Sequence, residues 1–555
     1  MNRSEEHATG APRRRWWQDL RWITAGIVVV LLAMIVWGLF GPEPPITVSR
    51  ETTYLTEPLA ADGLPDYGAA MLASLGPAPR PEDHAAVELL EVMWPLGIDA
   101  ADLPAVCKAL GIPHAPPADP LQGDPRDDAT AKVTFEMMDA ASERPWTAAE
   151  FPELAAWLVA REAALDRLVA AADRPRFWLP DPVLLRPGPQ LFLGINLSGV
   201  QGVRSAAYPL VLRAQGHVGA GRHVAAWRDI RAVYRLGRLL AVPENTPQCR
   251  VTQMVASGIN VKADAALTPG LLGAADLPAD VLAAIRRDLD ALGPLPEPQA
   301  SLANQRLMCI DAAVGLARRT PGGRAGRPAM LDDVFGRPRS PSLLITALLR
   351  SLDWDLVLQR INAEYDQLEA AARLPTRAAR QSEFYRLDEV VAERMPRSGW
   401  AAAGHAVLGC CSRRYRSEFL GDVLCREMVH PVGSCLDTVT RSQASFDLTC
   451  TAAALAAWKA DRAPGEEPYP ETLAALVPKY LAAVPLDPFS DKPFVYERRG
   501  EGYLLASVGH NGVYDGGDDW HGWIVGGEWQ TTPQAVDFNK SDLVVRMPVP
   551  PAVAP

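Results

Sequence analysis

Hydrophobic residues recur every three or four positions over much of the chain, which is the spacing of one face of an α-helix. Such stripes cover residues 87–94, 154–172, 282–292 and 354–368. Residues 203–240 look like two helices that turn back at Gly219-Ala220-Gly221. We find no internal repeat period. The pattern therefore predicts a mainly helical region, an irregular bundle or a solenoid-like array, over residues 51–445.

Smaller signals refine this prediction. Thr147 and Glu150 have the spacing of a capping box and predict a helix start before the stripe at 154–172. Asp353 is the expected N-cap of the helix over 354–368. Residues 51–58 are rich in β-forming side chains and predict a short strand.

One apolar run differs from the stripes. Residues 22–40 contain no charged side chain, and at about 1.5 Å per residue they approach the roughly 30 Å hydrocarbon core of a bilayer. Arginines precede the run and Glu43 follows it, so the positive-inside rule places the N-terminus in the cytoplasm. A cleaved signal peptide is the alternative, but no A-x-A site follows. We expect a cytoplasmic tail (1–21), one transmembrane helix (22–40) and a linker (41–50). The rest of the chain is then expected on the extracytoplasmic side of the membrane.

The stretch at residues 469–519 reads as a small module. Aromatic and aliphatic residues alternate on both sides of Arg499-Gly500-Glu501-Gly502, which predicts a two-stranded hairpin. A glycine-rich loop follows and contains Asp515, Asp518 and Asp519. Flexible backbone with several hard oxygen donors is what a calcium ion requires.

The order of these motifs resembles the C-terminal globular half of the type II secretion major pseudopilin. The likeness covers about a tenth of the chain, and it is carried by Tyr469-Pro470, Leu473, Leu476, Asp487-Pro488-Phe489, Pro493-Phe494, Tyr496, Ser507, Gly509, Asn511-Gly512, Gly516-Gly517 and Asp518-Asp519. The resemblance implies a small α+β module over residues 446–555. It also implies Ca²⁺ bound by Asp515, Asp518 and Asp519, with Asp542 as a later carboxylate. An acidic turn that binds no ion is the alternative.

The whole chain is also similar to uncharacterised bacterial membrane-anchored proteins, which join a variable helical ectodomain to the same tail. That likeness is carried by Asp487-Pro488-Phe489-Ser490, Pro493, Tyr496, Tyr503 and Ser507-Val508-Gly509. It implies a location in the bacterial inner membrane with the bulk periplasmic or otherwise extracytoplasmic, and it implies no established activity.

Composition narrows the classes of partner. The net charge is −11, with a pI of about 5.4, which argues against nucleic-acid binding. The eight cysteines suit disulfides or free buried thiols in an exported chain. A metal site that recruits His405 and His430 is less favoured, because the cysteine and histidine spacings of zinc sites are missing.

Four arginines share one helical face: Arg228, Arg231, Arg235 and Arg238. This face could bind an anionic lipid, glycan or phosphate. The alternatives are pairing with acidic residues of a neighbouring helix, or a solvated surface.

The sequence contains no G-x-S-x-G, H-E-x-x-H or P-loop motif. Three functions stay open. The first is a non-catalytic membrane-anchored scaffold or binding protein, stabilised by calcium, that contacts an unidentified envelope protein. The second is a component of secretion or envelope assembly. The third is an exported hydrolase with an unrecognised site, which a pocket with converging histidine and carboxylate side chains would support.

Overall fold

The computed structural model describes residues 16–548 except 94–97, 114–120, 122–131, 187–197, 243–244, 246–248, 297–298, 319–350, 396–403, 406, 410, 518–523, 526–527 and 530–541. The α-helices are α1 (Trp16–Phe40), α2 (Tyr67–Ser74), α3 (Ala85–Met93), α4 (Leu103–Leu110), α6 (Phe135–Glu143), α7 (Pro152–Ala160), α8 (Glu162–Ala172), α9 (Ser198–Gly219), α10 (His223–Ala241), α11 (Arg250–Ala265), α12 (Ala279–Leu292), α13 (Gln299–Ala317), α16 (Trp354–Ala372), α17 (Arg377–Glu393), α19 (Arg413–Leu424) and α20 (Gly433–Ala460).

Shorter elements connect these helices. The 3₁₀-helices are η1 (Pro81–Asp83), η2 (Pro182–Leu185) and η7 (Leu473–Leu476), and the π-helical turns are η4 (Ala266–Leu271) and η6 (Cys425–Val429). The strands are β1 (Val495–Arg499), β2 (Gly502–Ser507), β3 (Ile524–Val525), β4 (Glu528–Trp529) and β5 (Leu543–Met547). The chain is mainly helical with one small three-stranded antiparallel sheet.

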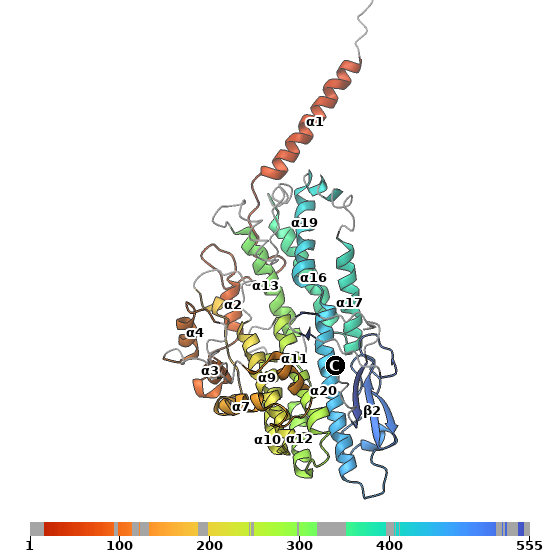
Figure 1. Ribbon diagram of the computed structural model, residues 1–555. Coiled ribbons are helices and arrows are strands. Elements are labelled where there is room, and N and C mark those ends of the chain that lie inside the picture. The colour runs from red at the N-terminus through yellow and green to blue at the C-terminus, as the bar shows by residue number, and fades with distance from the viewer. Residues whose placement is uncertain are drawn as a thin grey trace, which may run out of the picture.

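Helix α20 runs through the body and connects its two halves (Figure 1). Its first turns, at Leu436, belong to a hydrophobic core made with α2, α13, α16, α17 and α19. Its later turns, from Phe446 to Ala457, belong to a larger core made with α3, α7 to α12 and the sheet. The predicted boundary between residues 445 and 446 therefore falls inside one continuous helix.

The predicted helical pair over residues 203–240 is confirmed by α9 and α10. The chain reverses at Gly221, whose φ of +69° lies in the left-handed region that glycine adopts without strain. Gly219 is required by a close approach, since a Cβ there would lie 2.0 Å from the Trp146 carbonyl oxygen. The two glycines thus permit the reversal that the sequence indicated.

The stripe over residues 154–172 forms two helices, α7 and α8, which meet at Arg161. The Arg161 side chain is buried and donates to the carbonyl oxygens of Leu121 (2.7 Å) and Trp157 (3.2 Å). The predicted capping box is wrong. The amide of Glu150 donates to the Thr147 carbonyl oxygen in a turn, and α7 begins only at Pro152.

Two further local predictions have mixed outcomes. Asp353 occupies the N-cap position of α16, as expected, although its side chain makes no capping hydrogen bond. Residues 51–58 form turns rather than the predicted strand. The Thr53 hydroxyl donates to the Leu55 carbonyl oxygen (2.8 Å), and such local side-chain bonds satisfy backbone groups without a partner strand.

The C-terminal hairpin forms as predicted, with Val495 opposite Ala506 and Arg499 opposite Gly502. Strand β5 then pairs antiparallel with β2, so the sheet order is β1-β2-β5 and β2 is its central strand. The side chains of β2 are all buried, and Tyr503 and Leu505 join the larger core. The sheet lies beside the later half of α20 (Figure 1).

The prediction of a membrane anchor is wrong. Helix α1 extends away from the body (Figure 1). Among the described residues, however, no helix combines the length and apolarity that crossing a membrane requires. This finding corrects the single-pass architecture in the predicted fold class, and with it the inner-membrane location.

Candidate functional site

A pocket of about 960 Å³ lies among α3, α6, α7, α9 and α11. Its volume is within the roughly 300–1,000 Å³ that is typical of small-molecule sites. Most of the lining is apolar. The apolar and small side chains are Met93, Leu121, Val133, Phe135, Met138, Trp157, Ala207, Pro209, Val211, Gly258 and Ile259.

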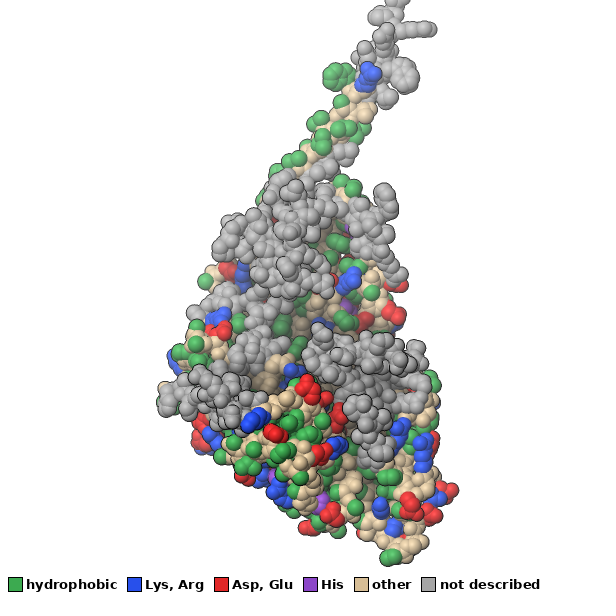
Figure 2. All heavy atoms as spheres, viewed as in Figure 1, with side chains coloured by type: hydrophobic (Ala, Val, Ile, Leu, Met, Phe, Trp, Pro, Cys, Tyr) green, Lys and Arg blue, Asp and Glu red, His purple; other side chains and the backbone are tan. Residues whose placement is uncertain are grey.

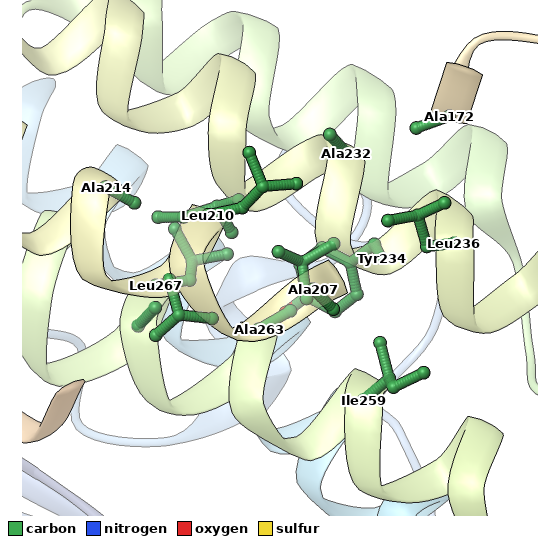
Figure 3. Close-up of a cluster of buried hydrophobic side chains, with 14 of the residues drawn as sticks. Ala172, Ala207, Leu210, Ala214, Ala232, Tyr234, Leu236, Ile259, Ala263 and Leu267 are labelled. Atoms are coloured by element: carbon green, nitrogen blue, oxygen red, sulfur yellow. The ribbon is translucent and has the colours of Figure 1, made fainter. Parts of the chain in front are cut away.

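One wall of the pocket belongs to the larger core. Ala207 on α9 and Ile259 on α11 line it, and Figure 3 shows both in the cluster that packs α9, α10 and α11 together. Residues 3% exposed or less, such as these two, seldom move without unpacking their neighbours. The pocket is therefore preformed on this side by the packing of the helices.

Two residues in this wall are unusual for a helix interior. A Cβ added at Gly258 would meet no atom within 4 Å, so the space in front of α11 is empty. Pro209 lies inside α9 and has no amide proton, which leaves the carbonyl of Ser205 without its usual helical donor. Both residues line the pocket. Residues that are unfavourable in helix interiors thus stand at the pocket.

The polar lining consists of few groups. Arg204, Ser205 and Tyr208 come from α9, with Arg204 and Tyr208 one helical turn apart. Lys262 comes from α11, and Asp139 comes from α6. Burial raises the pKa of Tyr208, so its hydroxyl is a neutral hydrogen-bonding group at physiological pH. The described part of the chain gives neither Arg204 nor Lys262 a carboxylate partner. Two cations and one carboxylate therefore face a mostly apolar space.

The arginine face predicted on α10 is bound to the neighbouring helix α8. Arg228 pairs with Asp166 (3.0 Å), and Arg231 pairs with Asp173 (2.8 Å). Arg235 donates to the carbonyl oxygen of Ala172 (2.7 Å) and also pairs with Asp173 (3.3 Å). Cations at a helix C-terminus are stabilised by the helix dipole. These three arginines match the alternative of pairing with a neighbouring helix.

Arg238 points into the core instead. Its guanidinium carbon lies 4.7 Å from the centre of the Phe446 ring, and its three nitrogens are buried without a hydrogen-bond partner among the described residues. Nearby, burial raises the pKa of Asp264 to about 7 although Tyr234 donates to it (2.6 Å). Burial likewise raises the pKa of Asp447 to about 6. The sequence analysis did not identify this buried polar group of residues.

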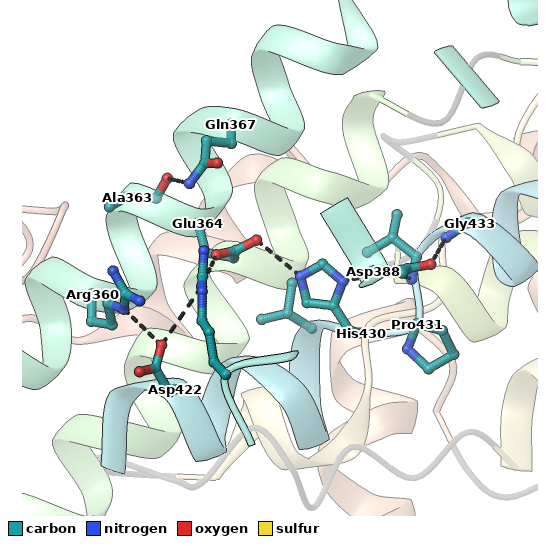
Figure 4. Close-up of polar contacts among 12 residues, drawn as sticks. Arg360, Ala363, Glu364, Gln367, Asp388, Asp422, His430, Pro431 and Gly433 are labelled. Carbon is teal, nitrogen blue, oxygen red and sulfur yellow. Dashed lines mark hydrogen bonds and ion pairs between the residues drawn. The ribbon is translucent and has the colours of Figure 1, made fainter. Parts of the chain in front are cut away.

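A second buried cluster surrounds His430 (Figure 4). Its Nε2 lies 3.1 Å from Glu364 of α16, and its Nδ1 is hydrogen-bonded to Asp388 of α17. Arg394 pairs with Glu364 (2.8 Å). Burial opposes protonation, but the two carboxylates outweigh it and raise the pKa of His430. The two carboxylates therefore favour the protonated form of the ring, which joins two helices.

Asp388 has a further role in the same cluster. It accepts the backbone amides of Val432 (2.8 Å) and Gly433 (2.7 Å), at the start of α20. A carboxylate there satisfies free amides and complements the helix dipole. The cluster is fully occupied by these contacts, and it joins α16, α17 and α20. Its chemistry is that of a structural link.

The C-terminal module brings several motif residues together. Ser507 donates to Asp487 (2.9 Å), which also accepts the amides of Phe489 (3.0 Å) and Val508 (2.8 Å). This explains why an Asp-Pro-Phe segment and a Ser-Val-Gly segment occur in one module: the carboxylate ties the proline-rich loop to the end of β2.

The predicted calcium loop is described only in part. Asp542 is buried and accepts the amides of Asp515 (2.9 Å) and Gly517 (2.9 Å), so it positions the loop. Asp518 and Asp519 lie outside the described residues. Within the described part of the chain, no group of three or more histidine, cysteine or acidic residues could hold a metal ion. The calcium site stays a prediction.

The described cysteines are free thiols: Cys107, Cys249, Cys309, Cys411, Cys425, Cys435 and Cys450. Cys410 lies outside the described residues. The described part of the chain thus follows the free-thiol alternative rather than disulfide pairing.

The fold and the pocket define a mainly helical protein with a largely apolar pocket that carries a few polar groups. Comparisons with known protein families, with curated proteins and with solved structures find no match.

Proposed function

We propose that this chain is a non-catalytic binding protein whose ligand occupies the pocket among α3, α6, α7, α9 and α11. The observation that carries the proposal is the pocket itself, whose volume and mostly apolar lining are those of ligand sites. Its lining has one carboxylate, Asp139, and includes neither histidine nor cysteine among the described residues. The predominantly apolar lining therefore supports ligand binding.

Filling the pocket tests this function. Gly258→Leu places a side chain in the empty space in front of α11, and it also replaces a helix-interior glycine, which favours the helix by about 0.5–1 kcal/mol. We expect the full-length variant to melt no lower than the wild type, but to bind the uncharged dye Nile red at least about tenfold more weakly, by fluorescence titration.

Gly258→Ala is the matched control, since it makes the same change to the backbone but adds only a methyl group. We expect it to keep most of the dye affinity. Equal dye binding by the wild type and both variants would show that the pocket is not the binding site.

We also propose that calcium stiffens the C-terminal loop. Without an ion, the carboxylates of this loop repel one another, and a bound cation removes that repulsion. Millimolar Ca²⁺ is therefore expected to raise the melting temperature of the full chain, and Asp515→Asn to reduce the rise. Glu501→Gln, at the exposed hairpin turn, should leave it unchanged. A melting temperature that does not respond to calcium would contradict the site.

A further inference from the structure

We infer that the ligand of this pocket is a single-chain amphipathic anion, with its apolar part among α6, α7 and α11 and its carboxylate or phosphate head at Arg204 and Lys262. This inference rests on the proposed binding function and adds the chemical class of the ligand. Its basis is the charge distribution of the lining.

The first observation is the contrast between Arg204 and the other arginines of this region. Arg213, on the same helix, bonds Asp229 through two nitrogens (2.7 and 2.9 Å) and also bonds Asp166 (2.9 Å). The arginines of α10 that face α8 are likewise bonded to it. Arg204 and Lys262 both line the cavity, and the described residues supply no carboxylate to either. Arg204 is exposed and Lys262 is half-buried, so both cations are hydrated and accessible to a ligand in the cavity that they line.

The second observation is the geometry of the polar groups. Arg204 and Tyr208 are separated by four residues on α9, so they lie on the same helical face, and Lys262 faces the same cavity from α11. Guanidinium and ammonium groups recognise carboxylate and phosphate oxygens. The Tyr208 hydroxyl is hydrogen-bonded to Ser142, so the donors for an anionic head are Arg204 and Lys262, one from each of two helices.

The third observation is the remainder of the lining. Trp157, Ile259 and Val211 are buried and apolar, and Phe135 is an exposed aromatic at the edge of the same pocket. A small inorganic anion would leave this surface unused. Asp139 is the acidic residue of the lining, and the charge of Glu143 also acts on the Tyr208 hydroxyl. Among the described contacts, Asp139 makes no ion pair with Arg204 or Lys262. The lining as a whole keeps one net positive charge.

Titration of the full-length protein with decanoate, decyl phosphate and decanol tests the inference, with calorimetry as the readout. We expect the wild type to bind at least one of the two anions about tenfold or more tightly than decanol, in a 1:1 ratio. The double variant Arg204→Gln/Lys262→Gln should bind that anion about 10- to 100-fold more weakly than the wild type does. Its affinity for decanol should stay within about twofold of the wild-type value. The preferred head group then identifies the source as a carboxylate or a phosphate amphiphile.

Two further variants make the outcomes distinct. Asp139→Asn removes the opposing charge and is expected to tighten the binding of the anion. Gly258→Leu is expected to weaken all three ligands, because it occupies the space of the shared chain. Equal affinity for decanol and both anions, or anion binding unchanged in the double variant, would overturn the anionic class while the pocket remains a binding site. Ligands that bind the Gly258→Leu variant and the wild type equally would overturn the pocket function itself.

Discussion

Asp229→Asn is expected to lower the free energy of unfolding by about 3–5 kcal/mol, because it leaves the buried cation of Arg213 without its main partner. The Asp229 side chain is fully buried and that of Arg213 is 7% exposed. Nε lies 2.7 Å from Oδ2, and a second guanidinium nitrogen lies 2.9 Å from Oδ1. Asparagine preserves the shape of the residue, so the loss of stability reflects the missing charge rather than a change in packing. Urea denaturation followed by circular dichroism measures it.

Asp166→Asn is the matched control on the same arginine. Asp166 contacts Arg213 at 2.9 Å but is 48% exposed, so water compensates its removal and we expect a loss below about 1 kcal/mol. Burial raises the pKa of Asp229 despite the bonds from Arg213, so desolvation opposes the attraction within the pair. The double variant Arg213→Met/Asp229→Leu should therefore recover most of the stability lost in Asp229→Asn. Similar losses for the two single variants would contradict a buried, charge-dependent link.

His430→Gln is expected to destabilise the protein by about 3 kcal/mol near pH 6, because it leaves the buried carboxylate of Glu364 and the neighbouring Asp388 without the cation between them. The pKa of His430 is raised above its ordinary value of about 6.5. Its stabilisation is therefore complete below the unfolded-state pKa, and it is lost as the pH rises through the folded-state pKa. The difference in unfolding free energy between the wild type and His430→Gln should therefore decrease as the pH rises through the folded-state pKa.

The acid side of the same experiment has a different cause. Burial raises the pKa of Glu364, but its bonds to His430 and Arg394 outweigh this and lower it overall, so its contribution is present above about pH 4.3 and is lost as the pH falls through the lowered value. Burial also lowers the pKa of His84 and of His217 to about 4. These two rings oppose folding increasingly as the pH falls from about 6.5 towards 4. The contribution of His430 is therefore obtained only from the difference in unfolding free energy between the wild type and His430→Gln.

His510→Gln applies the same substitution to an exposed ring and is expected to change stability by less than about 0.5 kcal/mol at every pH. Thermal or urea unfolding at pH 5 to 9 gives the profile for each protein. A constant difference between wild type and His430→Gln across this range would mean that packing, rather than the protonated ring, provides the link among α16, α17 and α20.

Much of the secondary structure could be predicted from local pattern. The turn at Gly221 and the stripes on both sides of it predict α9 and α10, because helix periodicity is a property of neighbouring residues. The hairpin of β1 and β2 follows for the same reason, since alternation and a glycine turn lie within a few residues. The run at 22–40 is the counterexample. Its composition predicted a membrane-spanning helix, which the described structure does not support.

The sites depended on contacts between distant positions. His430 meets Glu364 and Asp388 across 66 and 42 residues, and Arg204 and Lys262 reach one cavity from two helices. These charged residues are isolated in the sequence and form no motif with a recognisable spacing. Their sequence context therefore does not distinguish them from ordinary surface residues. A glycine at position 258 and a proline at 209 were the available signals, because each is unfavourable in a helix interior without a reason in packing or function.

The amino-acid sequence by itself determined the predominance of helices, the α9–α10 reversal and the C-terminal hairpin, because these follow from periodicity and from glycine and proline at fixed local positions. Tertiary structure alone decided that β5 completes the sheet, that Arg228, Arg231 and Arg235 bind α8, and that a pocket opens in front of Gly258. The physical reason is that burial and partner choice depend on which surfaces meet in three dimensions. Arg228 pairs with a carboxylate on a neighbouring helix, whereas the described residues give Arg204 no such partner.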